Sequence, residues 1–253
     1  MLIELNQEIL EGLSKTEREI VVFINENEKR LAQLSIVDIA FDTYTSPSTV
    51  SRAIRKCGIN GFNELRYRLT EKGADKDIQN MGEILNKSLI EAQRVLEQIS
   101  LASVLEFISV IKGASRVFVL ARGLTEYVAQ EFTLKLQLLD FNAVFFSDPN
   151  IMRKKSETMR ADEALVIFSL NGGTRELIES AQNANHRKAK VVTCCCNENS
   201  ELIQVSNVNL IGFKHRHDAI TEYEVASRVS LHMMARIIID YLVEEQGKTV
   251  FRT

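Results

Sequence analysis

Residues 35–65 read SIVDIAFDTYTSPSTVSRAIRKCGINGFNEL, and this stretch carries the start signals of two successive helices. Ser35 and Asp38 form a capping box, in which a hydroxyl and a carboxylate three residues apart each bond a free backbone amide of the other. Ser46-Pro47 supplies a second N-cap with proline at the first helical position, and Gly58 is placed to end that helix. The sequence therefore predicts two short helices in close succession.

Similar signals lie on both sides of this stretch, so that residues 1–72 are predicted to be entirely helical. Ser14 and Glu17 form another capping box, and a further helix follows Gly61. The apolar pattern then lapses over residues 73–80, GADKDIQN, where we expect a short hinge or helix break. We accordingly assign an all-α domain to residues 1–75, a connecting helical segment to residues 76–106 and a second domain to residues 107–253.

The second domain alternates short β-type runs with helical segments, after an apolar helix that ends at Gly113. That order is typical of a parallel α/β sheet flanked by helices, and five strands are predicted. A long final helix is expected over about residues 223–245, where apolar positions recur at helical spacing. The predicted strands are Val117–Leu120, Ala143–Phe146, Leu165–Ser169, Lys190–Cys195 and Val208–Ile211.

Composition narrows the class of protein. The 253 residues are 45% hydrophobic and 26% charged, and 31 Lys and Arg against 34 Asp and Glu leave a net charge of −3, which is ordinary for a globular protein. The longest apolar runs, such as residues 117–121, are far shorter than the roughly 20 residues that span a bilayer. The N-terminus does not show a basic stretch followed by an apolar one. We therefore expect a cytoplasmic protein with no membrane partner.

The four cysteines do not indicate a metal, cofactor or disulfide framework. Cys57 stands alone, while Cys194, Cys195 and Cys196 are consecutive. Neighbouring residues on a strand point to opposite faces, so three consecutive thiols cannot converge on one ion. We interpret the triplet as part of a buried strand, and we expect neither a metal site nor a cofactor.

The predicted helix after Ser46 has one apolar face and one polar, basic face. Val50, Ala53, Ile54 and Cys57 share an arc of about 100° on a helical wheel, which predicts the core-facing side. Small hydroxyl side chains and guanidinium groups on the opposite side suit DNA, because they donate to phosphates and base edges and let the helix enter the major groove. A solvated face on a protein-interaction bundle is the alternative. The opposite arc carries Ser48, Ser51, Arg52 and Arg55, with Thr49 and Lys56 at its edge.

The charge distribution agrees with an anionic partner. Residues 1–42 hold four basic and nine acidic side chains, a net −5, whereas residues 43–72 hold six and two, a net +4. Segments of opposite sign within one small helical domain predict a basic face that approaches an anion.

Residues 35–65 closely resemble the helix-turn-helix of RpiR-type transcriptional regulators. The matching positions are Ile39, Ala40, Ser46, Thr49, Val50, Arg52, Gly58, Gly61 and Phe62. The resemblance implies a first helix ending near Asp42, a turn at residues 43–45, a recognition helix at residues 46–57 and double-stranded operator DNA as partner. The predicted DNA-contacting residues are Thr45, Ser46, Ser48, Thr49, Ser51, Arg52, Arg55 and Lys56.

Two strand-to-helix loops in the second domain have the composition of anion-binding loops. Residues 169–174 read SLNGGT, and residues 121–125 read ARGLT. Glycine and hydroxyl residues at such a turn let backbone amides surround a phosphate, and the helix dipole favours its charge. Both loops are expected at the carboxyl ends of strands, where open parallel sheets bind ligands. Thr174 is a candidate donor to the ligand or simply the N-cap of its helix.

These loops, together with residues 199–202 and Ser227-Arg228, resemble those of the sugar isomerase (SIS) domain over about residues 107–242. The resemblance implies a phosphorylated sugar as effector. The chain departs from the family pattern because Ala121 replaces a glycine, Thr125 and Asn171 replace serines, and Cys195 replaces a threonine. Arg122 is either a direct phosphate ligand or a solvated loop residue. The predicted ligand-binding residues are Arg122, Gly123, Thr125, Ser169, Asn171, Gly172, Gly173 and Thr174.

The sequence thus favours a transcriptional regulator of sugar metabolism over an enzyme. An SIS domain serving only as a dimerisation scaffold is one alternative. The other is a phosphosugar isomerase, whose acid and base candidates would be His215, His217, Glu222 and Glu224. A homodimer or tetramer is expected, because helix-turn-helix proteins read paired half-sites and the apolar helix at residues 225–239 offers a pairing surface.

Overall fold

The structure is a computed structural model that describes residues 2–3, 6–28, 30–31, 34–71, 76–214, 219–220, 223–224 and 226–247. Two compact units divide the chain between Leu89 and Ile90, and each is described here by itself. The first unit contains helices α1 (Gln7–Gly12), α2 (Lys15–Glu26), α3 (Ile36–Asp42), α4 (Pro47–Lys56) and α5 (Phe62–Glu71), and α6 (Lys76–Gln98) crosses the division.

The predicted caps define the helices of the first unit. Ser14 and Ser35 each close a reciprocal capping box, with Glu17 and Asp38 respectively, and the Ser46 hydroxyl accepts from the Thr49 amide at the start of α4. The apolar face predicted for α4 is confirmed, since its members are buried in a core that α2 and α3 complete. The fully buried side chains of these helices are Ile20, Val21, Ile24, Ile39, Val50, Ala53 and Ile54.

The second unit is built on a five-stranded parallel sheet of order β2-β1-β3-β4-β5, which confirms the predicted strands and their direction. After β1 the chain forms β2 at one edge of the sheet, and it then places β3 on the other side of β1. The connections that follow β1 and β3 therefore run in opposite directions, which makes the position between these two strands a topological switch point. The strands are β1 (Arg116–Leu120), β2 (Ala143–Phe146), β3 (Glu163–Ser169), β4 (Lys190–Cys195) and β5 (Val208–Ile211).

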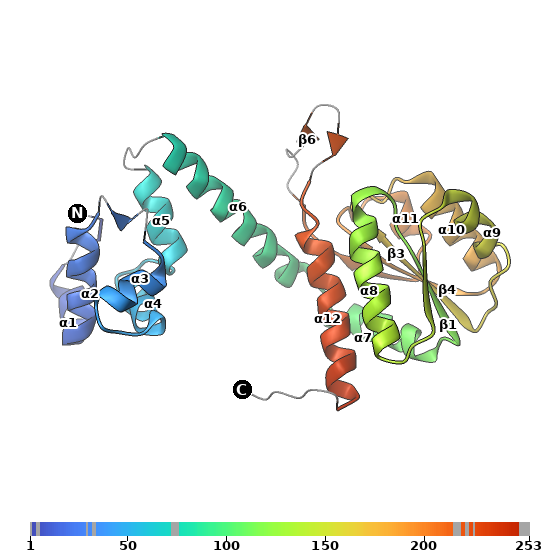
Figure 1. The fold of residues 1–253 in the computed structure, drawn as a ribbon, viewed down its shortest axis with the longest axis horizontal. Helices are drawn as coiled ribbons and strands as arrows, with labels where there is room; N and C mark the ends of the chain where they lie inside the picture. Colours follow the sequence, from blue (N-terminus) through green and yellow to red (C-terminus); the bar gives the residue numbers. More distant parts are fainter. Residues whose placement is uncertain are drawn as a thin grey trace. The chain divides into compact units, whose positions relative to one another are not determined.

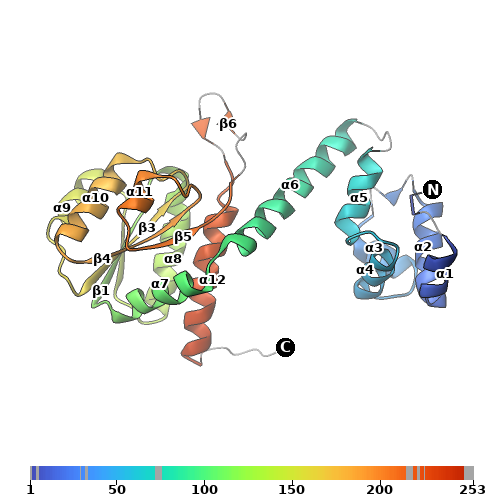
Figure 2. The same cartoon turned by 180° about the vertical axis from the view of Figure 1, so that it is seen from behind.

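Helices cover both faces of this sheet (Figure 1). Phe107, Phe132 and Phe168 lie in the core on the face covered by α7, α8 and α12, and the opposite face packs against α9, α10 and α11 (Figure 2). The helices are α7 (Leu101–Gly113), α8 (Glu126–Leu138), α9 (Pro149–Ser156), α10 (Arg175–His186), α11 (Glu201–Gln204) and α12 (Val229–Glu245), and a 3-10 turn, η2 (Gly123–Thr125), precedes α8.

The expected helix break is shorter than predicted, and the expected start of the final helix is wrong. Two separate helices, α5 ending at Glu71 and α6 beginning at Lys76, lie on either side of residues 72–75. Residues 76–80, expected in a hinge, form the first turns of α6, while residues 73–75 lie outside the described residues. Polar residues alone do not end a helix, because Lys and Gln are good helix formers and this segment contains no proline. The final helix begins at Val229, and Tyr223–Glu224 instead forms a short strand, β7, that pairs antiparallel with β6 (Ala219–Ile220).

The interpretation of Cys194, Cys195 and Cys196 as buried strand is confirmed for the first two, which lie in β4, and Cys196 is buried directly after it. Among the helices that the structure describes, none combines the length and apolar character needed to cross a membrane.

Candidate functional site

The exposed face of α4 presents the predicted combination of hydroxyl and basic side chains. Ser46, Ser48 and Thr49 form a hydroxyl cluster at the N-terminus of this helix, with Oγ to Oγ of 2.7 Å for Ser46 and Ser48 and Oγ to Oγ1 of 2.9 Å for Ser46 and Thr49. Arg52 and Arg55 are exposed one and two turns further on, and neither is bonded to a described residue. Ser51 is half-buried beside them. Both guanidinium groups are thus open to an anionic partner.

Two of the predicted DNA contacts have partners within the unit. Lys56 Nζ donates to the Glu17 carboxylate at 2.7 Å and to the Gly12 carbonyl at 3.2 Å, so this side chain ties α4 to α2. The ammonium of Lys56, together with the Ser14 amide, lowers the pKa of the buried Glu17 carboxyl to about 2. Thr45 shares a hydrogen bond with Thr43, at 3.0 Å between their Oγ1 atoms, inside the turn.

Tyr44 was not selected from the sequence, yet it is the most exposed aromatic of the turn before α4. Its side chain is 97% exposed, and its backbone is left-handed with φ of 52°. This conformation is uncommon for a residue other than glycine, asparagine or aspartate. Sequence patterns gave no signal for it, because a lone aromatic residue between two threonines fits a helix or a strand equally well.

Residues 169–174 form a tightly held loop between β3 and α10, which we call the second loop. The Gly172 amide donates to Ser169 Oγ at 3.0 Å, and the Gly172 backbone is left-handed with φ of 66°. A Cβ atom on Gly172 would lie 2.1 Å from Ser200 Oγ, so only glycine fits here. Gly173 has open space around it. Thr174 occupies the N-cap position of α10, but its hydroxyl does not bond the helix, which leaves it available to a ligand.

Residues 121–125, the first loop, follow β1, which is the neighbour of β3 in the sheet. Arg122 Nη1 donates to the Ser147 carbonyl at 2.5 Å and lies 3.5 Å from Glu126 Oε1. The same carboxylate oxygen accepts from the Gly123 amide at 3.0 Å. The Glu126 carboxylate therefore already holds two donors that the sequence assigned to a phosphate. Thr125 is buried.

Lys214, three residues beyond β5, is a basic side chain at this edge that sequence reasoning missed. Its ammonium donates to the Asn171 side chain in the second loop, and Asn197 Nδ2 donates to the Asn171 carbonyl at 3.1 Å. The structure thus brings residues from the ends of β3, β4 and β5 together. The only available sequence signal was the position of Lys214 after a predicted strand.

The buried thiols at the end of β4 are not suited to nucleophilic or metal chemistry. Burial raises the pKa of Cys195, and burial together with Cys195 and Glu91 raises the pKa of Cys196 to about 12. Both thiols therefore stay protonated at neutral pH, and the thiolate is the reactive and metal-binding form.

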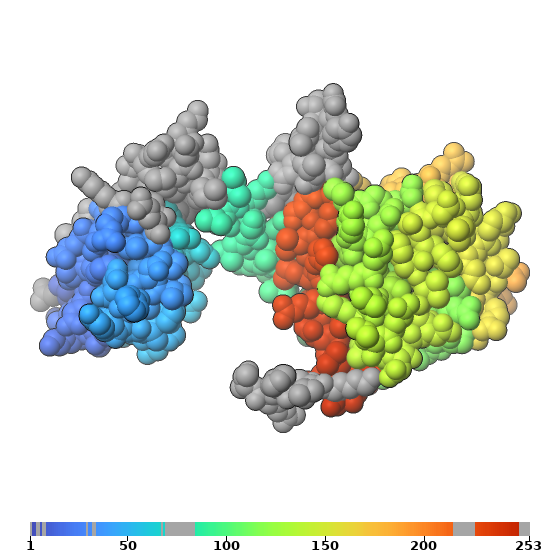
Figure 3. Space-filling view, viewed as in Figure 1, coloured from blue at the N-terminus to red at the C-terminus, as the bar shows by residue number. Residues whose placement is uncertain are grey.

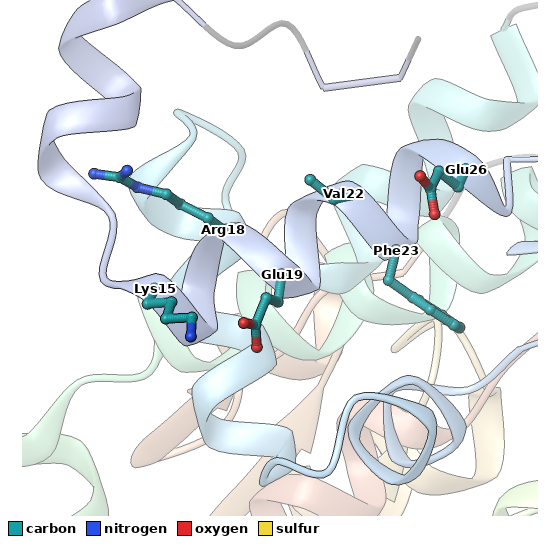
Figure 4. A pocket seen from close by; sticks show the side chains of 6 residues that line it. All are labelled: Lys15, Arg18, Glu19, Val22, Phe23 and Glu26. Carbon is teal, nitrogen blue, oxygen red and sulfur yellow. The ribbon is translucent and has the colours of Figure 1, made fainter.

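The hollow on the first unit does not gather its side chains into a second site, and most of the isomerase candidates fall outside the part of the chain that the structure describes. A hollow of about 520 Å³ runs along α2, and Figure 4 shows that the labelled side chains point away from one another instead of converging. It is lined by Lys15, Arg18, Glu19, Val22, Phe23 and Glu26. His215, His217 and Glu222 lie outside the described residues, and Glu224 is described only as part of the strand β7.

Comparison with known proteins identifies both units. A family model described as the SIS domain matches residues 110–237, and one described as the helix-turn-helix domain of the rpiR family matches residues 1–76. The chain therefore combines a helix-turn-helix region with a sugar-isomerase type of domain. It belongs to the RpiR family of helix-turn-helix transcriptional regulators.

Individual relatives agree with this assignment. An HTH-type transcriptional regulator of Clostridium perfringens, named as uncharacterised, is 24% identical over 94% of this chain and 89% of its own length. HexR of Escherichia coli is 22% identical over 76% of this chain and 71% of its own. The solved structure of the Vibrio vulnificus NanR protein complexed with ManNAc-6P matches 94% of this chain and 90% of that chain, with a TM-score of 0.61 and 21% identity. The first two relatives are named as transcriptional regulators and not as enzymes, which agrees with the family to which this chain belongs.

Proposed function

We propose that this chain is a cytoplasmic regulator of sugar metabolism that binds operator DNA as a homodimer or tetramer through α4, and that a phosphorylated sugar bound at the second loop changes its operator affinity. The proposal of DNA binding rests on two exposed guanidinium groups, those of Arg52 and Arg55, which lie beside the hydroxyl cluster of α4. Arginines and hydroxyls are the groups that contact phosphates and base edges in a major groove.

The proposal that a phosphorylated sugar binds to this chain rests on the conformation of the second loop. The Ser169 hydroxyl bonds the Gly172 amide, and Ser200 leaves no room for a side chain at Gly172. The loop lies at the N-terminus of a 12-residue helix, α10, whose N-cap hydroxyl does not bond the helix. Backbone amides and the helix dipole favour a doubly charged phosphate at such a place. A phosphosugar is also the ligand named in the NanR complex, whose fold this chain shares.

A pair of neighbouring glycines gives a matched test. Gly172→Ala places a methyl group against Ser200, whereas Gly173→Ala meets open space. Calorimetry with glucosamine 6-phosphate, ribose 5-phosphate, ManNAc-6P and inorganic phosphate should show binding by the wild type and by Gly173→Ala, and none by Gly172→Ala. Both variants should keep the affinity of the ligand-free protein for DNA from upstream of its own gene.

If the wild type binds none of the four probes but still binds DNA, this result would instead favour an SIS domain that serves only as a dimerisation scaffold. A phosphosugar that binds without any change in DNA affinity would also contradict the proposed coupling, which we expect to be about 1 to 3 kcal/mol.

A further inference from the structure

Tyr44, in the turn between α3 and α4, has a large aromatic side chain that the first unit does not use. The residue is 97% exposed, and none of the hydrogen bonds or ring contacts among the described residues involves its ring or its hydroxyl. Apolar surface stabilises a fold only when it is removed from water. The stability of the unit therefore gives no reason for a tyrosine at this position.

The backbone of Tyr44 is held in a conformation that other residue types adopt more readily. Its φ of 52° is left-handed, which favours glycine, asparagine and aspartate. Hydrogen bonds on both sides fix the turn, because the Thr45 amide donates to the Ala40 carbonyl at 2.8 Å and the Thr43 hydroxyl donates to the Ile39 carbonyl at 2.6 Å. Strained backbone of this kind clusters at functional positions. A tyrosine here is thus better explained by a contact outside the chain than by the turn itself.

Tyr44 lies directly before the part of α4 that is proposed to meet DNA. Only Thr45 separates it from Ser46, which caps α4 and forms the hydroxyl cluster with Ser48 and Thr49. Two residues span at most about 7 Å of chain, so the phenol projects into solvent next to that cluster. A duplex seated on the N-terminus of α4 therefore comes within reach of the Tyr44 hydroxyl.

The charges around Tyr44 favour DNA over a protein partner. Asp38 and Asp42 are the last acidic side chains before it, and residues 43–63 contain three basic side chains and no acidic one. A segment whose charges are all positive attracts a polyanion. The phenol adds a neutral donor to this segment, and tyrosine is among the side chains that bond phosphate oxygens in protein–DNA complexes. Tyr44 therefore suits a phosphate of the duplex that α4 binds.

We propose that the Tyr44 hydroxyl donates a hydrogen bond to a backbone phosphate of the operator and so positions α4 in the major groove. This inference rests on the proposed DNA binding and deepens it, since it adds a contact outside the recognition helix. Because the turn is held by hydrogen bonds, a phosphate bonded to Tyr44 fixes the orientation of α4 on the duplex. The contact carries no sequence information, in contrast to a base read by Arg52.

The test compares Tyr44→Phe, which lacks only the hydroxyl, with Phe41→Ala, which removes an aromatic side chain without a donor from a position that is 79% exposed on α3. Fluorescence anisotropy of the full chain uses DNA from upstream of its own gene and a random-sequence duplex of equal length. Tyr44→Phe should weaken binding to both duplexes by about 10-fold, as expected for one lost hydrogen bond to a charged group. The slope of the salt dependence should not change, because no cation is removed. Phe41→Ala should bind as the wild type does.

Thermal unfolding of Tyr44→Asn separates this role from a structural one. Asparagine adopts the left-handed conformation more readily than tyrosine, so the unfolding midpoint should not fall, while the DNA affinity should fall as in Tyr44→Phe. A lowered midpoint, or a loss of affinity confined to the upstream duplex, would overturn the proposal. An equal loss in Phe41→Ala would also overturn it and would indicate a protein contact instead.

The outcome for the wild type separates this proposal from the proposed function. Wild-type binding to the upstream DNA with no effect of Tyr44→Phe would overturn the contact and leave the proposed function standing. Absence of wild-type binding to both duplexes would overturn the two together.

Discussion

At the scale of single residues, Glu126 shows how a loop can satisfy its own donors. Its carboxylate holds the Gly123 amide and lies beside Arg122, and its negative charge opposes an anion at the neighbouring second loop. Glu126→Gln should therefore strengthen the binding of inorganic phosphate about threefold, since charges in a partly exposed site are screened by solvent. Calorimetry at low ionic strength measures this. Glu131→Gln, on the same helix, α8, is the control, and equal affinities for all three proteins would contradict the prediction.

Glu17 makes the stability of the first unit dependent on acid. Its pKa in the folded protein is about 2, below the ordinary value of 4.5, so the stability it contributes is present above about pH 4.5 and is lost as the pH falls towards 2. Lys56→Met should lower the free energy of unfolding by about 1 to 2 kcal/mol at pH 7. This loss is smaller than for a fully buried ion pair, because Lys56 is partly exposed and solvent screens its charge. Urea unfolding at pH 7 and pH 3 should show this difference shrinking at the lower pH, whereas a constant difference would exclude Glu17 as its source.

At the scale of elements, the prediction about DNA affinity concerns the arginines of α4. Arg52→Ala should weaken operator binding by about 1 to 3 kcal/mol if the side chain reads a base, and Arg55→Ala should reduce the slope of the salt dependence by about one unit if it contacts a phosphate. Fluorescence anisotropy over a range of salt concentrations measures both effects. Arg94→Ala, on α6 and outside the helix-turn-helix, is the control. Unchanged affinity in the Arg52→Ala, Arg55→Ala double variant, with helicity retained, would remove α4 from the interface.

The elements also show which features the sequence could predict. Capping boxes and apolar spacing are local signals, so Ser14, Ser35 and the five strands were found at nearly their observed positions. Interactions between distant residues leave no such signal. The bond from Lys56 to Glu17, the contact of Lys214 with Asn171 and the burial of Glu91 depend on tertiary packing. The helix break expected over residues 73–80 was drawn too long, since residues 76–80 are helical, because polar residues are compatible with a helix as well as with a loop.

At the scale of the whole molecule, α8 and α12 lie side by side on one face of the second unit (Figure 3), where His232 Nδ1 is 3.4 Å from Glu131 Oε2. Most apolar residues of α12 are buried in the core of the second unit, and the exposed large apolar residues of the two helices are Tyr127, Leu134 and Leu138 on α8 and Val229 and Tyr241 on α12. Exposed apolar side chains on two adjacent helices are a candidate pairing surface.

This face gives a prediction for assembly. Leu134→Glu combined with Leu138→Glu should shift the protein from dimers or tetramers to monomers at micromolar concentration, because a buried unpaired carboxylate opposes association. Sedimentation velocity measures the change, and Leu105→Glu, an exposed leucine on α7, is the control. The monomeric variant should also lose most of its operator affinity, since each subunit reads one half-site. A wild-type protein that sediments as a monomer would contradict the expectation of an oligomer.

The unbroken run of α6 from Lys76 to Gln98 has a mechanical consequence. At 1.5 Å per residue, the part of this helix between Glu91 and Lys76 is about 22 Å long. A rigid rod of that length, tilted by about 10° at one end, moves its other end by about 4 Å, close to the 3.4 Å rise between successive base pairs. In the proposed regulator, a small change in the direction of α6 at its C-terminal end would thus move its N-terminal end by about the distance between two base pairs.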